Sequence, residues 1–206
     1  MIKRVLNYFN YIWYFIAFQR INVCLSKAAL GSSVRRVDLK DPLSWEFSGF
    51  SQNGEDGILD VLISKLKKPS KIAIEIGANN GFENCTAYLA IVKKYFTLMI
   101  DGNPSLVKRS NLILNHLQCY FESICKFVDR DNLIFLEKDY AHLKELDVFS
   151  IDIDGIDYYV AKKFLEMGFN PKIIIAEYNS SFGHERAVTV PYHSDYVKHV
   201  NTGGYP

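Results

Sequence analysis

A regular alternation of short apolar runs with segments of helical spacing, starting near Gly54, constrains this sequence more than any other feature. The segments of helical spacing predict helices over 55–68, 83–94, 104–116, 130–146 and 157–168. Five intervening runs rich in branched apolar residues predict buried strands at 71–77, 96–101, 119–128, 147–153 and 172–178. Strands and helices that alternate in this way form right-handed βαβ units. We therefore predict an α/β fold with a mostly parallel, doubly wound sheet.

Length and charge divide the chain into a short N-terminal segment, 1–40, and one domain, 41–206. With 206 residues and 49% hydrophobic content, the chain can bury one substantial core. Residues 1–40 carry seven Lys or Arg and one acid, whereas 41–206 carry seventeen bases and twenty-two acids. A mildly acidic domain argues against nucleic acid as a partner. The four cysteines form no CxxC pair, which favours a reducing, cytoplasmic setting.

The N-terminal stretch MIKRVLNYFNYIWYFIAFQR is aromatic, apolar and bounded by bases. It is short for a membrane span and lacks a small-residue cleavage site after the apolar run. On a helix, one face carries Lys3, Asn7, Asn10 and Tyr14, and another carries Val5, Phe9, Ile12 and Ile16. Two interpretations stay open. Residues 1–27 lie on a membrane surface, at its inner face, or the helix packs on the domain or on a partner subunit.

Four acids fall at or near the carboxyl ends of predicted strands: Glu75, Asp101, Asp154 and Glu177. In parallel sheets, ligands bind at this edge, near the point where the strand order reverses. We therefore expect the four acids to converge on one cleft.

The first of these loops, EIGANNG, indicates the class of cofactor. Asn79 stands where a dinucleotide-binding G-x-G-x-x-G loop has its second glycine. A polar loop with an acid at the strand end suits a ligand with an amino group and a positive centre, such as S-adenosylmethionine. Asp101, at the end of the next strand, can accept hydrogen bonds from both ribose hydroxyls. A turn formed with Gly102, Asn103 and Pro104 is the simpler alternative for Asp101.

Five blocks in order, FSQNGEDGIL, IEIGANNG, MIDGNP, SIDIDGIDYYV and IAEYNSSFG, resemble the FkbM-type branch of the S-adenosylmethionine-dependent methyltransferases. The resemblance covers about Phe47 to Tyr192. It implies a Rossmann-like methyltransferase fold and transfer of a methyl group to a hydroxyl oxygen of a sugar or other secondary metabolite. A small-molecule or glycan acceptor is therefore the expected partner.

The resemblance also implies roles for individual residues. The first loop, with Glu75, Gly77, Asn79 and Gly81, would line the methionine end of the cofactor. Ser51, Gln52 and Glu55 belong to a block that would fold over the cofactor. The family commonly continues with a further helix and two strands, whereas this sequence ends at Pro206. We therefore expect a sheet of five strands that lacks its C-terminal edge strands.

The acids after the fourth and fifth strands offer chemistry for the acceptor. A hydroxyl must lose its proton to attack a methyl group, and Asp154 is the first candidate for the base. Glu177 and Asn179 would orient the acceptor or, together with Asp154, hold a divalent cation, the less favoured interpretation. Asp157 is expected in the first turn of a helix. Asp152 is expected on the same strand face as Asp154, one step deeper.

Two other classes of function compete with the methyltransferase hypothesis. One is a non-catalytic relative that keeps the fold and serves as a binding or scaffold module in a glycan pathway. The other is a nicotinamide oxidoreductase, against which the missing G-x-G-x-x-G counts.

Overall fold

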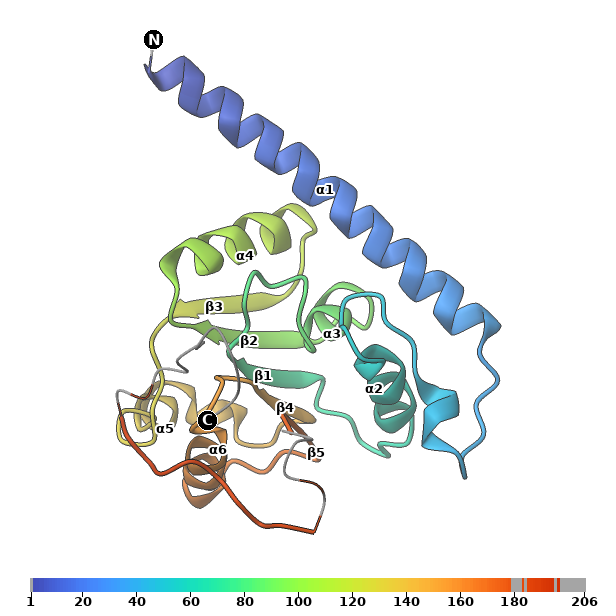
Figure 1. Ribbon diagram of the computed structural model, residues 1–206, viewed down its shortest axis with the longest axis vertical. Coiled ribbons are helices and arrows are strands. Elements are labelled where there is room, and N and C mark those ends of the chain that lie inside the picture. Colours follow the sequence, from blue (N-terminus) through green and yellow to red (C-terminus); the bar gives the residue numbers. More distant parts are fainter. Residues whose placement is uncertain (1, 179–182, 184, 195, 197–206) are drawn as a thin grey trace.

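The computed structural model describes residues 2–178, 183, 185–194 and 196, and a five-stranded sheet lies at its centre (Figure 1). The strands follow the order β3-β2-β1-β4-β5, and all neighbours pair in parallel. This confirms the predicted α/β class, and the order is compatible with a Rossmann-like fold. The strands are β1 (Ile72–Ile76), β2 (Phe96–Asp101), β3 (Phe121–Cys125), β4 (Val148–Ile151) and β5 (Ile173–Ala176).

The helices differ in how closely they match the sequence prediction. The helix over 104–116 has the predicted bounds because the Asn103 side chain accepts a hydrogen bond from the Ser105 N–H and Pro104 fits the first turn. The predicted 83–94 helix is shorter because the Asn80 side chain accepts the N–H groups of Phe82 and Glu83 before it, and the Asn84 side chain accepts the N–H of Ala87, its first residue. The helices are α1 (Ile2–Val34), α2 (Glu55–Ser64), α3 (Ala87–Ile91), α4 (Pro104–His116), α5 (Phe135–Tyr140) and α6 (Asp157–Glu166), with 3₁₀ turns η1 (Pro42–Trp45) and η2 (Ala141–Leu143).

The sheet buries a separate hydrophobic cluster on each face. Along β1, Ile74 and Ile76 belong to one cluster and Ala73 to the other, as expected for side chains that alternate along a strand. The first cluster includes Phe149 of β4, which stacks on Phe164 of α6 with ring centroids 4.0 Å apart. A sheet covered on both faces leaves its strand ends as the natural place for a ligand.

Helix α1 contacts the domain through residues of its second half. Ile21 is buried in a small cluster with Phe82 and Ile113, and Ala28 is buried beside Gly49. In Figure 1 the N-terminal turns of α1 continue past the sheet and the helices that cover it. None of the helices in the described part of the chain has the length and apolar character needed to cross a membrane.

Candidate functional site

A cavity of about 640 Å³ lies at the carboxyl ends of β1, β2, β3 and β4. Its volume is in the range of small-molecule sites. It lies over the ends of the neighbouring strands β1 and β4, where the strand order reverses. This is the position expected for a ligand in an open parallel sheet. The lining residues are Ile76, Gly77, Ile100–Pro104, Lys126–Val128, Asp152–Asp154, Ile156 and Tyr196.

Gly77 begins the tight loop after β1 that forms one wall of this cavity. Its φ of +87° is a left-handed conformation, and a Cβ there would lie 1.8 Å from the carbonyl oxygen of Asp152. The N–H groups of Gly77 and Ala78 both donate to the carbonyl of Ile100, at 2.8 and 3.1 Å. Glycine therefore allows the first loop to sit between the ends of β2 and β4.

Asp101 ends β2 with its carboxylate held by two backbone groups. One oxygen accepts the N–H of Asn79 at 2.9 Å and the other accepts the N–H of Asn103 at 2.7 Å. An ionised carboxylate offers about four lone-pair positions, so two hydrogen bonds leave it able to accept more. The sequence-predicted residues Gly77 and Asp101 thus both line the cavity, and the N–H of Asn79 helps to fix the carboxylate of Asp101.

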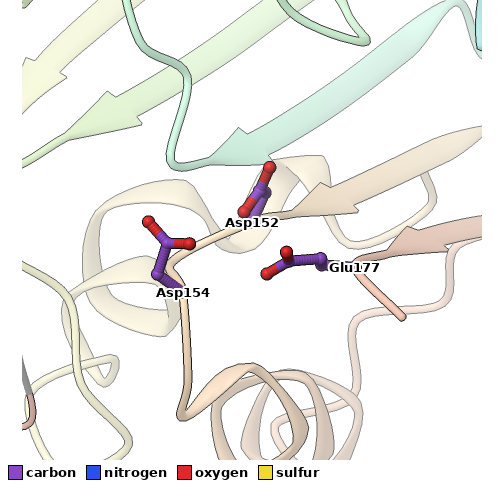
Figure 2. Close-up of side chains that lie close together, drawn as sticks. All are labelled: Asp152, Asp154 and Glu177. Atoms are coloured by element: carbon purple, nitrogen blue, oxygen red, sulfur yellow. The ribbon is translucent and has the colours of Figure 1, made fainter. Parts of the chain in front are cut away.

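Three carboxylates lie close together near the other side of the cavity: Asp152 and Asp154, which line it, and Glu177, which does not. Figure 2 shows the three side chains. One ligand oxygen from each of Asp152, Asp154 and Glu177 lies within 4.8 Å of the others, and all three side chains are exposed. Two of them follow β4, and the third follows β5. Such a cluster can accept the proton of a hydroxyl group or supply oxygen ligands to a divalent cation.

The structure corrects the sequence prediction for Asp152, which is exposed and not deeper than Asp154. Strand β4 ends at Ile151, so the alternation of a strand does not continue through the two acids. Asp157 does begin α6, as predicted. Its carboxylate accepts the N–H groups of Ile153 and Gly155, both at 2.8 Å, and so fixes the loop that carries Asp154.

Glu75 lies outside the residues that line the cavity. Its side chain is buried and accepts hydrogen bonds from the N–H groups of Cys85 and Thr86 and from the hydroxyls of Thr86 and Ser150. Burial raises the pKa of Glu75 from 4.5 to about 7, although these donors oppose the rise. Through these hydrogen bonds Glu75 of β1 connects the segment before α3 to β4.

The remaining predicted cofactor residues also lie outside the cavity lining. Gln52 is exposed, and the carboxylate of Glu55 accepts the N–H of Asn53 in its own loop at 2.7 Å. Gly81 is buried against α4, where a Cβ would lie 2.2 Å from the Ser110 hydroxyl oxygen. Asn179 is outside the described residues.

Sequence reasoning missed the segment after β3, which contributes Lys126, Phe127 and Val128 to the cavity. Because the strand was predicted over 119–128, these residues fell inside it. The observed strand ends at Cys125, and they follow it at the same edge as the predicted acids. The ammonium of Lys126 lies 4.7 Å from the ring centroid of Phe135. It places one positive charge in a cavity wall that otherwise carries acids.

Comparison with known proteins gave no match to a protein-family model and no match to a curated protein.

Proposed function

We propose that this protein is an S-adenosylmethionine-dependent methyltransferase that acts on a hydroxyl oxygen of a sugar or another metabolite. The observation that carries the proposal is the position of Asp101, which lies at the end of β2 in a cavity at the reversal of strand order. The acid cluster on the other side of the same cavity supplies a place for an acceptor. The resemblance of five sequence blocks to FkbM-type enzymes supports the same conclusion.

The residues around Asp101 fit the nucleoside part of the cofactor. The carboxylate is held by the N–H groups of Asn79 and Asn103 and can still accept hydrogen bonds from two ribose hydroxyls. When bound, S-adenosylmethionine supplies a methyl group carried on a positively charged sulfur. The acceptor oxygen bonds to the methyl carbon as the sulfur leaves with S-adenosylhomocysteine. A site that holds its carboxylate in place before binding loses little entropy when the ligand arrives.

On the acceptor side, Asp154 takes up the hydroxyl proton and so makes the oxygen a better nucleophile. The loop that carries it is fixed by Asp157, which keeps the base in position. Glu177 and Asp152, within 4.8 Å, orient the acceptor. The same three carboxylates are suitable oxygen ligands for Mg²⁺ or Mn²⁺, and a requirement for either ion would assign the proton loss to a metal site.

Calorimetric titration with S-adenosylmethionine and S-adenosylhomocysteine tests the proposal. We expect both to bind the intact protein and Asp101→Ala to weaken binding about ten- to a hundredfold, because a charged hydrogen bond contributes roughly 1.5 to 3 kcal/mol. Asp139→Ala, which removes an exposed aspartate of α5, is the matched control and should bind normally. Binding of neither ligand to the intact protein would overturn the proposal, and binding of NAD instead would favour an oxidoreductase.

A further inference from the structure

We propose that α1 binds the surface of an anionic lipid bilayer through the helix face turned away from the domain. This inference is independent of the proposed enzymatic function, because it rests on α1 and its contacts alone.

The face of α1 that contacts the domain is defined by buried residues at helical spacing. Ile21 and Ala28 are 3% and 6% exposed, and Leu25 between them is partly buried. The helix is fixed near its end by Arg35, whose guanidinium donates to the carbonyls of Trp45 and Gly57 and pairs with Asp60. The orientation of α1 around its own axis is therefore set over its second half.

The opposite face of α1 exposes apolar side chains. Val23, Leu30 and Val34 are 53%, 64% and 67% exposed, and their spacing of seven and four residues places them in one stripe. The exposed stripe over residues 23–34 therefore lies on the side of the helix away from the domain. Because α1 is one continuous helix from Ile2 to Val34, the same helical spacing can be followed in the sequence toward its first turns, where it meets Val5, Phe9, Ile12 and Ile16.

The charge of α1 selects the partner that covers the stripe. The helix carries Lys3, Arg4, Arg20 and Lys27 and not a single acid in its sequence. A second copy of α1 packed along this stripe would bring like charges together without acids to pair with them. An anionic bilayer attracts them, and each base near its surface contributes roughly fivefold in affinity. Arg20 already pairs with Glu83 at 2.6 Å. The sequence places Lys3 on the face of Asn7 and Asn10, so Arg4 and Lys27 are the bases for lipid.

The aromatic content of the first turns fits the same partner. Tyr8, Tyr11, Trp13 and Tyr14 are residue types that concentrate at the headgroup level of membranes. Since α1 is not apolar enough to cross a bilayer, the expected arrangement is a helix lying in the interface. The domain, attached to the other face of α1, would then lie on the water side.

Vesicle co-sedimentation of the full chain tests this inference. We expect the protein to pellet with phosphatidylcholine vesicles that contain 30% phosphatidylserine at low salt, and to bind at least tenfold less to pure phosphatidylcholine or in 0.5 M salt. Ile12→Asn combined with Ile16→Asn should reduce binding at least tenfold. The matched control, Asn7→Gln with Asn10→Gln, changes the other face without changing charge and should bind within twofold of the wild type.

Three results would overturn the inference. They are a protein that stays in the supernatant with anionic vesicles at low salt, one that binds neutral vesicles equally well, and a double-Asn variant that pellets like the wild type. Light scattering without lipid measures whether the protein dimerises through α1. A dimer that the double-Asn substitution converts to a monomer would assign the stripe to self-association. Near-ultraviolet circular dichroism verifies that both variants keep the folded domain.

Discussion

Replacing Glu75 by glutamine tests how this sheet tolerates a buried carboxyl group at its centre. Burial raises the pKa of Glu75 to about 7, against 4.5 for the free side chain. The folded protein therefore holds a proton that the unfolded chain releases, over a window from about pH 4.5 to about pH 7. In that window the contribution of Glu75 to stability decreases as pH rises. Below about pH 4.5 the stabilising contribution of Glu75 is fully present, and above about pH 7 it has been lost.

The size of the effect follows from the two pKa values. At roughly 1.4 kcal/mol for each pKa unit, the free energy of unfolding should lose about 2.5 kcal/mol between pH 5 and pH 8 through this group alone. Glutamine does not ionise, so the variant lacks this loss. The amide also has one acceptor oxygen where the carboxylate has two, and each carboxylate oxygen accepts one backbone N–H, from Cys85 or Thr86. One N–H then loses its acceptor, at a cost of about 1 to 3 kcal/mol that does not depend on pH.

Urea unfolding at pH 5, 6, 7 and 8, followed by circular dichroism, measures both parts of the effect. The wild type minus variant difference in the free energy of unfolding should decrease by about 2.5 kcal/mol across this range. Glu166→Gln, at the exposed end of α6, controls for the change in net charge. A difference that stays constant with pH would show that Glu75 is ionised in the folded protein and would refute the reasoning.

Three further substitutions, one of them paired with a control at Gly183, test other parts of the domain. Gly77→Ala should cost more than about 3 kcal/mol in urea unfolding, because its Cβ overlaps the Asp152 carbonyl; Gly183→Ala, at φ +68° with open space around it, should cost only about 1 kcal/mol. Burial alone would raise the pKa of Asp147, but Lys172 and two backbone N–H groups lower it overall. Asp147→Asn should therefore cost about 2 kcal/mol at pH 7, and the part of this cost that comes from the ionised carboxylate should decrease as the pH falls through the lowered pKa of the folded protein. Asp154→Asn should abolish methyl transfer from labelled S-adenosylmethionine to a saccharide panel while calorimetry shows cofactor affinity within twofold. An unchanged transfer rate would remove Asp154 as the base.

The sheet could be predicted because local sequence and burial agree along most strands. The buried β2 has the predicted bounds, whereas β3 was predicted over 119–128 and is limited to Phe121–Cys125. As an edge strand, β3 is only partly buried, and its pairing ends where β2 ends, which hydrophobicity alone does not reveal. The helix predicted over 130–146 is divided between α5 and η2.

The candidate site was predictable where position along a strand decides, and less so where distant contacts decide. Asp101 and Asp154 reach the cavity because they follow parallel strands. The surroundings of Glu75 depend on Ser150, which is 75 residues further along the chain, and no local pattern encodes that contact. Likewise, only the end of β4 at Ile151 determines that Asp152 is exposed.

The central place of β1 also sets an order of events during folding. Its neighbour β2 follows closely in the chain, but β4 arrives after β3 and two further helical segments, and parallel pairing over such a separation is slow. Until β4 docks, the carboxylate of Glu75 lacks the Ser150 hydroxyl and much of its cover. Bringing β4 against β1 at neutral pH therefore draws a fraction of a proton from solvent, so proton uptake accompanies the formation of this strand pair.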